Sequence, residues 1–165
     1  MKNNVTLIGM PGAGKSTVGV LLAKLLGYQF VDTDLLIQAQ EEKLLWEIIR
    51  DEGIEGFHAI EERVNASLDL KRHVIATGGS VIYGEKAMEH LREISTVVYL
   101  RHDYDTIAAR LGDLAQRGVT LPEGWTLRDL YNERAPLYEK YAHIVMDTNA
   151  DNIQENAITL RRCLL

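Results

Sequence analysis

The 165-residue sequence contains one cysteine, Cys163, and only three prolines. A single cysteine cannot form an internal disulfide, and this composition is typical of proteins from a reducing compartment. No segment reaches the roughly 18 consecutive apolar residues that a membrane-spanning helix needs. The N-terminal sequence MKNNVTLIGM leads directly into a predicted strand, so we expect no signal peptide. We therefore expect a cytoplasmic protein without a membrane partner.

Positive charge is also scarce, because 18 Lys and Arg residues face 24 Asp and Glu residues, giving a net charge of −6. A chain this acidic is repelled by phosphate backbones, so we expect no nucleic-acid partner. The length and the 46% hydrophobic content suit one domain with an adequate core. Neither a linker-like composition nor an internal repeat is present, so residues 1–165 are predicted to form a single domain.

Five short apolar runs alternate with longer amphipathic segments. Runs this rich in β-branched and aromatic residues are typical of buried parallel strands, and they occupy residues 5–9, 28–32, 73–77, 96–100 and 143–147. The segments with helical periodicity occupy residues 16–26, 35–53, 55–68, 86–94, 104–116, 126–141 and 153–165. This alternation predicts an α/β fold in which helices cover both faces of a parallel sheet.

The sequence GMPGAGKST, residues 9–17, is the strongest functional signal. It lies between a predicted strand and a predicted helix, which is the context of the Walker A motif G-x-x-x-x-G-K-[ST]. Glycine-rich backbone presents N–H groups to phosphate oxygens, and the N-terminus of the helix attracts the same anion. Lys15 is predicted to reach the β- and γ-phosphates of a nucleotide, and Ser16 to provide a hydroxyl for Mg²⁺. An accidental glycine-rich turn does not explain Lys-Ser-Thr at this offset.

A Walker A motif alone does not distinguish ATPases, GTPases and small-molecule kinases. The chain is short for a motor protein, and no N-K-x-D motif of the kind that reads guanine is present. A compact kinase is therefore the favoured class.

Asp32 and Asp34 follow the second predicted strand in the sequence VDTD. Ligands bind at the carboxyl ends of strands in open α/β sheets, and residues two apart on extended backbone point the same way. We therefore expect both carboxylates in the active site, one near Mg²⁺ and one accepting the proton of a substrate hydroxyl. The alternative for Asp34 is a helix N-cap, which would leave Asp32 without a role. Gly78 and Gly79, in TGGS after the third predicted strand, indicate either close approach to a ligand or a simple turn.

Together these segments resemble the shikimate kinase family of P-loop kinases. The resemblance covers nearly the whole chain in order and spacing: GMPGAGKSTVG (9–19), FVDTD (30–34), GF-x-x-x-E (56–61), VIATGG (74–79), VVYL (97–100), ERAPLYEKYA (133–142) and DT (147–148). It implies a five-stranded P-loop kinase fold, ATP and Mg²⁺ as cofactors, an acceptor-binding helical section at about 34–70 and a mobile lid at about 112–125. The lid prediction agrees with the polar sequence RGVTLPEGW (117–125), which is typical of a surface loop.

The resemblance also implies roles for individual residues. Asp34 is the implied base for the acceptor hydroxyl, Asp32 lies on the metal side with Ser16, and Arg134 binds the acceptor's carboxylate. Arg117 is the implied lid arginine, although GVTL follows it where the family has Pro-Leu-Leu, and Arg110 lies near the adenine ring. For Arg110 and Arg117 solvated surface charges are the alternative. The nucleotide-binding set is Gly12, Ala13, Gly14, Lys15, Ser16, Thr17 and Arg110, and the acceptor-binding set is Asp34, His58, Glu61, Gly78, Gly79, Ser80 and Arg134.

Two residues depart from the family pattern on the acceptor side. His58 replaces an arginine that anchors the acceptor's carboxylate, and Ser80 replaces a third glycine. Losing one charged partner of a carboxylate costs about 1.5–3 kcal/mol, or roughly 10- to 150-fold in affinity. Arg63, about one turn further along the helix, is a possible substitute. For His58 we favour a place in the acceptor pocket, held by Glu61, over a metal ligand, a catalytic base or a surface residue.

The sequence therefore predicts an ATP-dependent kinase of a small hydroxyl-bearing metabolite, with shikimate as the first candidate. A different hydroxy acid, polyol or amino acid is the alternative acceptor. A nucleotide-binding regulator without catalysis is a third possibility, which the presence of Lys15, Ser16, Asp32 and Asp34 disfavours. We expect a monomer, with a dimer as the alternative.

Overall fold

The computed structural model describes residues 2–111, 118–148 and 152–165. Five strands form one sheet with the order β2-β3-β1-β4-β5, and every pair of neighbours is parallel. The strands are β1 (Val5–Ile8), β2 (Gln29–Asp32), β3 (His73–Ala76), β4 (Thr96–Arg101) and β5 (Ile144–Asp147). Each begins and ends within one residue of its predicted range, so the predicted five-stranded parallel sheet is confirmed.

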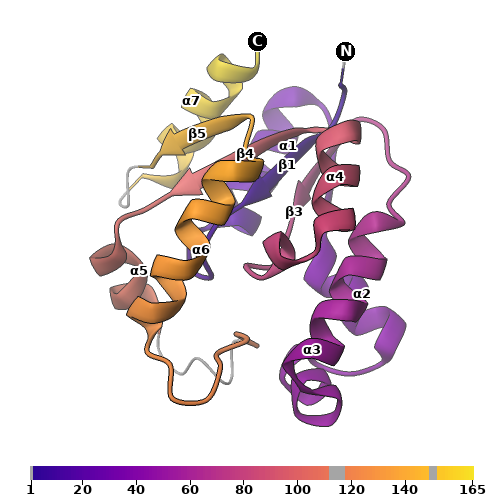
Figure 1. Ribbon diagram of the computed structural model, residues 1–165. Helices are drawn as coiled ribbons and strands as arrows, with labels where there is room; N and C mark the ends of the chain where they lie inside the picture. The colour runs from indigo at the N-terminus through magenta and orange to yellow at the C-terminus, as the bar shows by residue number, and fades with distance from the viewer. Residues whose placement is uncertain (1, 112–117, 149–151) are drawn as a thin grey trace.

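Helices cover both faces of this sheet (Figure 1). Helices α1 (Lys15–Leu26) and α7 (Ile153–Leu164) pack on one face, and α4 (Glu85–Ile94) and α6 (Leu127–Tyr141) pack on the other. In Figure 1, α4 and α6 lie in front of the sheet and α1 and α7 behind it. This arrangement confirms the doubly covered α/β fold.

Alternation along β4 shows how one strand serves both layers. Val98 and Leu100 belong to the hydrophobic cluster that includes Leu22 of α1, whereas Tyr99 packs in the cluster that includes Met88 of α4. All five side chains are at most 1% exposed. A strand buried on both faces needs continuous hydrophobic sequence, which explains why TVVYL predicts it well.

The helical section after β2 differs from the prediction. Residues 35–53 do not form one helix, because Glu42 adopts a left-handed conformation (φ 54°) that ends α2 (Thr33–Glu41). Helix α3 (Leu45–Ala66) follows and is kinked at Gly53, whose φ is 74°. The two helices enclose a small core of their own, formed by Ile37, Ile48, Phe57 and Val64. A short 3-10 helix, Val81–Tyr83, was not predicted.

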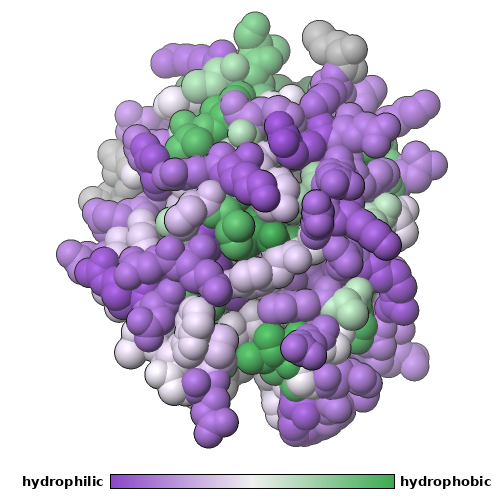
Figure 2. All heavy atoms as spheres, viewed as in Figure 1, coloured by the Kyte–Doolittle hydropathy of each residue, from purple (hydrophilic) through white to green (hydrophobic). Residues whose placement is uncertain are grey.

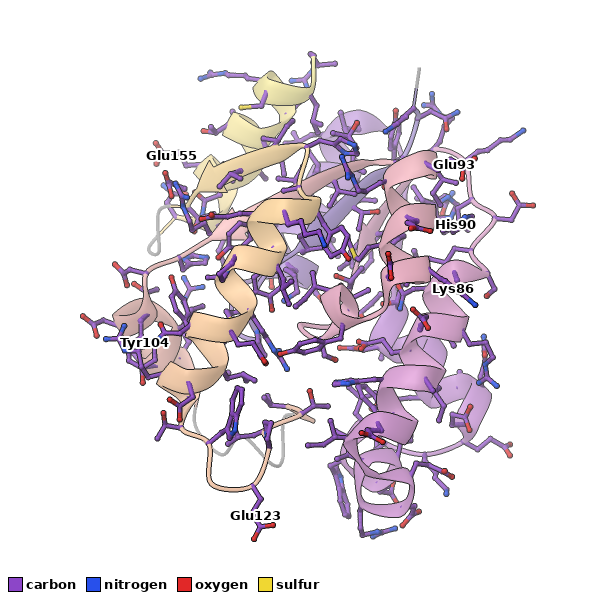
Figure 3. All side chains as sticks on the ribbon, viewed as in Figure 1. Lys86, His90, Glu93, Tyr104, Glu123 and Glu155 are labelled. Carbon is purple, nitrogen blue, oxygen red and sulfur yellow. The ribbon has the colours of Figure 1, made fainter. Side chains whose placement is uncertain are left out.

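The loop before α6 is only partly the polar surface loop that the sequence predicts. Val119 and Thr120 are buried, at 9% and 3% exposure, whereas Glu123 is exposed and points away from the molecule (Figure 3). Helix α5 is described over Tyr104–Arg110. Residues 112–117, with Arg117 and much of the predicted lid, lie outside the described residues. The buried first part of the loop is therefore part of the protein interior.

The order of the strands places the site. The chain runs from β1 to one side of the sheet through β2 and β3, and then crosses to β4 and β5 on the other side. The segment after β1 therefore lies where the strand order reverses, the usual position of ligands in such sheets. Hydrophilic side chains cover most of the face shown in Figure 2, and hydrophobic ones form small separate patches. Within residues 2–111, 118–148 and 152–165, no helix combines the length and apolarity needed to cross a membrane.

Candidate active site

A cavity of about 330 Å³ lies at the carboxyl ends of β1, β2 and β3. The phosphate loop forms one side of it, and the first turn of α2, the middle of α3 and the segment after β3 form the others. Residues 118–120 and Arg134 of α6 complete the lining. The cavity thus joins the predicted nucleotide site and the predicted acceptor site in one space.

The phosphate loop has the backbone that the motif requires. Gly14 is the N-cap of α1 with a left-handed φ of 84°, a conformation that glycine adopts without strain. Residues of the predicted nucleotide-binding set that line the cavity are Gly12, Gly14, Lys15, Ser16 and Thr17. Ala13 is not among the lining residues, and its N–H donates to the carbonyl of Met10 instead.

Lys15 is buried and its ammonium group donates to the carbonyls of Gly9 (2.7 Å) and Met10 (2.8 Å). Burial lowers the pKa of Lys15 to about 8, although the nearby Asp34 carboxylate opposes this shift. The side chain is therefore still mostly protonated at neutral pH, and its position inside the cavity suits it to bind an anion. A phosphate oxygen can replace the two carbonyls as its partner.

Two side chains support the loop from behind. Arg110 donates through Nη1 to the carbonyl of Gly12 (2.8 Å), and His102 Nε2 lies 2.9 Å from the carbonyl oxygen of Ala13. Neither residue lines the cavity. The structure thus places Arg110 against the phosphate loop, and its predicted contact with adenine is a separate proposal.

Asp32 and Asp34 have different positions, contrary to the expectation that they share one extended strand. Asp32 is the N-cap of α2, because its Oδ1 accepts from the N–H of Asp34 (2.9 Å). Asp34 lies in the first helical turn and lines the cavity, whereas Asp32 does not. The cap is therefore Asp32 rather than Asp34, and the helix, not the strand, aims Asp34 at the cavity.

Asp32 also connects to the phosphate loop, since the hydroxyl of Ser16 donates to its Oδ2 at 2.7 Å. A hydroxyl and a carboxylate at a helix N-terminus are hard oxygen donors of the kind that Mg²⁺ prefers. The Ser16 and Asp32 oxygens therefore fit the predicted metal role.

Two carboxylates converge at Gly78. A Cβ atom added to Gly78 would lie 2.6 Å from Oδ1 of Asp34 and 2.8 Å from Oε2 of Glu61. A side chain at position 78 would therefore displace these carboxylates, and both oxygens are buried without a hydrogen-bond partner in the described part of the chain. Burial raises the pKa of Asp34 to about 6, with a further contribution from the Asp32 charge. Burial also raises the pKa of Glu61 to about 8. Unpaired buried oxygens are costly, so they indicate a site that a ligand completes.

Ser80 lines the same cavity and binds the other oxygen of Glu61. Its hydroxyl donates to Oε1 at 2.6 Å. This hydrogen bond corrects the expectation that Glu61 holds His58. The serine therefore orients the Glu61 carboxylate and leaves Oε2 free to meet a ligand.

His58 lies one layer behind the cavity, contrary to its predicted place in the acceptor pocket. Its Nε2 is 3.1 Å from the hydroxyl of Thr120, and its ring stacks on Tyr83 with 4.9 Å between centroids. Burial and the positive charge of Arg134 lower the pKa of His58, so the ring is neutral at pH 7. Arg63 does not replace the missing arginine, because it is exposed and pairs with Glu41 (2.8 Å).

Arg134 is only 1% exposed and lines the cavity. Its Nη2 donates to the hydroxyl of Thr120 (2.9 Å), and its Nη1 would lie 2.9 Å from a Cβ atom added at Gly79. No ion pair within the described part of the chain involves Arg134. A buried guanidinium without a carboxylate is a binding site for an anion.

Sequence reasoning missed three residues that organise the site. Thr120 joins His58 to Arg134, Tyr83 stacks on His58, and His102 supports the phosphate loop. Thr120 was missed because its neighbours are polar or turn-forming and predict an exposed loop. No local pattern marks Tyr83 or His102, whose roles arise only from tertiary packing.

Comparisons with known proteins agree with this geometry. The family model described as shikimate kinase matches residues 11–164. Shikimate kinase 2 of Yersinia enterocolitica is 34% identical over 154 residues, covering 89% of this chain and 87% of the relative. Shikimate kinase 2 of Serratia proteamaculans is 36% identical over 152 residues with the same coverage.

Solved structures give the same result. A shikimate kinase from Acinetobacter baumannii in complex with shikimate superposes with a TM-score of 0.84 at 31% identity, covering 99% of this chain and 93% of that one. A shikimate kinase from Aquifex aeolicus has a TM-score of 0.78 at 27% identity, with 98% of each chain covered. The chain therefore belongs to the shikimate kinase family, P-loop enzymes that use ATP and Mg²⁺ to phosphorylate an alcohol.

Proposed function

We propose that this enzyme transfers the γ-phosphoryl group of ATP to a hydroxyl of a small carboxylic acid, with shikimate as the first acceptor to test. The observation that carries the proposal is the unpaired Oδ1 of Asp34, which lies in the same cavity as Lys15 and the phosphate loop. The bound shikimate of the Acinetobacter baumannii relative supports that choice of first acceptor.

The phosphate side of the cavity binds and orients the triphosphate. Backbone N–H groups of the loop and the N-terminus of α1 attract the phosphate oxygens. Lys15 leaves the Gly9 and Met10 carbonyls to bind the β- and γ-phosphates. Ser16 and Asp32 would hold Mg²⁺, which neutralises charge on the phosphates when it is bound. These groups act by positioning and electrostatics, which supply most of the catalysis in phosphoryl transfer.

Asp34 orients the acceptor hydroxyl and accepts its proton. As the hydroxyl oxygen forms a bond to the γ-phosphorus, the bond from that phosphorus to the bridging oxygen breaks and ADP leaves. The proton passes to Oδ1 of Asp34, which accepts no hydrogen bond from the described part of the protein. A carboxyl pKa of about 6 is close to neutral and therefore suits a general base.

Arg134 binds the carboxylate of the acceptor. Its guanidinium is buried and unpaired by any acid, and its fork of N–H groups matches a carboxylate. Gly78 and Gly79 leave room for the acceptor between Arg134 and Asp34, since a side chain at either position would collide with these groups.

Further assignments belong to the same proposal. Arg117 closes over the phosphates as a lid arginine, and Arg110 contacts the adenine ring as well as the phosphate loop. The chain acts as one domain, is monomeric and works in the cytoplasm.

An ADP-release assay with ATP, Mg²⁺ and shikimate tests the proposal. We expect ADP formation that depends on the acceptor, rises to saturation with acceptor concentration and disappears in Lys15→Ala. A broader panel of hydroxy acids and polyols accompanies shikimate. Turnover no faster than the hydrolysis of ATP by water for every acceptor would contradict the proposal.

A further inference from the structure

We propose that the preferred acceptor is a small hydroxy-amino acid, whose ammonium group binds Oε2 of Glu61 while its hydroxyl meets Oδ1 of Asp34 and its carboxylate binds Arg134. This inference rests on the proposed phosphoryl transfer and names the chemical class of the acceptor.

Glu61 is the first reason. Only 2% of its surface is exposed, and it lines the cavity. Oε1 accepts from Ser80, while Oε2 has no hydrogen-bond partner. No ion pair within residues 2–111, 118–148 and 152–165 includes Glu61. While the cavity is empty, burial raises the pKa of Glu61 to about 8, so this carboxyl is mostly protonated at pH 7. An ammonium group of a ligand at Oε2 favours the ionised form, so its binding releases that proton and forms a buried ion pair.

The position of Asp34 relative to Glu61 is the second reason. Their free oxygens converge on one point beside Gly78, and the negative charge of Asp34 is one of the causes that raise the pKa of Glu61. A ligand hydroxyl satisfies one of these oxygens but adds no charge. An ammonium group provides three N–H donors and a positive charge, and in a short amino acid it lies close to the side-chain hydroxyl. A hydroxyl and an ammonium together therefore match the two oxygens.

Arg134 and His58 are the third reason. Arg134 has no acidic partner among the described residues, so it is available to a carboxylate. His58 occupies the place where the family pattern has a second arginine, and it is neutral and turned to Thr120. With Lys15 assigned to the phosphates, Arg134 is available to a carboxylate of the acceptor, and Oε2 of Glu61 still has no hydrogen-bond partner within the described residues. A zwitterion contacts both groups, whereas an acceptor with only a carboxylate provides no N–H donor for Oε2 of Glu61.

Matched acceptors isolate the ammonium group. Initial rates of ADP release are measured for L-serine against 3-hydroxypropionate, L-homoserine against 4-hydroxybutyrate, and shikimate. These pairs differ only in the amino group. We expect the amino acid of the better-fitting length to exceed both its deaminated analogue and shikimate in kcat/KM by roughly tenfold or more.

Glu61→Gln tests the residue itself, because glutamine keeps the shape and an oxygen for Ser80 but cannot ionise to pair with an ammonium group. We expect kcat/KM for the amino acid to fall roughly 10- to 150-fold, while the deaminated analogue loses much less. Unchanged affinity for a fluorescent ATP analogue shows that the variant is folded.

His58→Arg provides a second test that does not depend on Glu61→Gln folding. An arginine three residues before Glu61 on the same helix can pair with it and supply a second cation for a carboxylate. We expect the ratio of amino-acid to shikimate kcat/KM to fall at least about tenfold.

The outcomes separate this inference from the proposed function. If shikimate or a deaminated analogue is the best acceptor of the wild type, the hydroxy-amino acid inference is overturned and phosphoryl transfer stands. An unchanged acceptor ratio in both Glu61→Gln and His58→Arg also overturns it. If no acceptor is phosphorylated, the proposed function and this inference fail together.

Discussion

The titration of Asp34 connects the geometry of one residue to the pH dependence of the reaction. A general base must be ionised, and burial together with the charge of Asp32 raises the pKa of this carboxyl to about 6. We expect kcat/KM to rise with pH up to about 6 and to fall about tenfold per pH unit below it. Rates between about pH 5 and 8 check this, with circular dichroism showing that the protein stays folded. A profile that is flat across this range would exclude Asp34 as the base.

Thr120 positions two other residues through one hydroxyl group. Its Oγ1 lies 2.9 Å from Nη2 of Arg134 and 3.1 Å from Nε2 of His58. Thr120→Val keeps the volume but removes this hydroxyl, so the buried guanidinium loses a partner and its orientation. We expect the acceptor KM to rise roughly tenfold with a smaller change in kcat.

Thr120→Ser restores the hydroxyl and serves as the matched variant. We expect it to recover most of the acceptor affinity that valine loses. If the valine and serine variants have the same KM, the hydroxyl does not position Arg134.

At the residue scale, the sequence predicted which residues line the cavity better than it predicted their hydrogen-bond partners. Lys15, Asp34 and Arg134 line one cavity as expected, because the motifs that contain them are tied to strand and helix ends. The partners of His58 and Glu61 were wrong, since Thr120 and Ser80 bind them instead. Partners from distant segments leave no mark in local sequence patterns.

At the scale of elements, the N-terminus of α2 combines a structural role with a chemical one. Asp32 caps the helix through Oδ1 and accepts from Ser16 through Oδ2. Asparagine still caps a helix, whereas alanine does not. We expect Asp32→Ala to lower the free energy of unfolding by about 1 kcal/mol and Asp32→Asn to change it little.

Activity separates the two roles of Asp32. Because both variants lose the carboxylate beside Ser16, we expect both to need a higher Mg²⁺ concentration for half-maximal rate. Thermal unfolding and Mg²⁺ titrations of the rate measure these effects. Equal destabilisation of both variants, or an unchanged Mg²⁺ requirement, would contradict the double role.

The strands were the most predictable elements, and the helices after β2 the least. Buried strands such as β4 have continuous hydrophobic sequence that is hard to mistake. The break between α2 and α3 depends on a left-handed conformation of Glu42. The glycine that usually marks such a helix end is absent from this position. The sequence EEKLLWEII therefore predicts a continuous helix, and the break is found only in the folded structure.

At the scale of the whole molecule, the buried acids make stability depend on pH. Folding raises the pKa of Glu61 from 4.5 to about 8 and that of Asp34 from 3.8 to about 6. A raised carboxyl pKa contributes stability that is complete below the unfolded pKa and is lost as pH rises through the folded one. We expect the ligand-free protein to lose stability between about pH 5 and 8, on the order of a few kcal/mol.

Chemical denaturation at several pH values measures this dependence, and Glu61→Gln is its control. The variant lacks the Glu61 carboxyl, which has the larger of the two pKa shifts. Its free energy of unfolding should therefore change less with pH over the same range. Lys15 adds little to the pH dependence in this range, because its contribution to stability changes only between its folded pKa of about 8 and its unfolded value of 10.5. Parallel curves for wild type and variant would show that Glu61 is not the source.

The most direct test of Asp34 as the general base is the rate at which the Asp34→Asn variant transfers the γ-phosphoryl group in a single turnover. The enzyme is saturated with radiolabelled ATP, mixed with the best acceptor of the wild type, and the labelled product is followed over time. Asparagine preserves the shape and the hydrogen bond to the hydroxyl but cannot take its proton. We expect the rate to fall by about 10²- to 10⁴-fold while the affinity for ATP is unchanged. A variant that phosphorylates the acceptor at the wild-type rate would contradict the account.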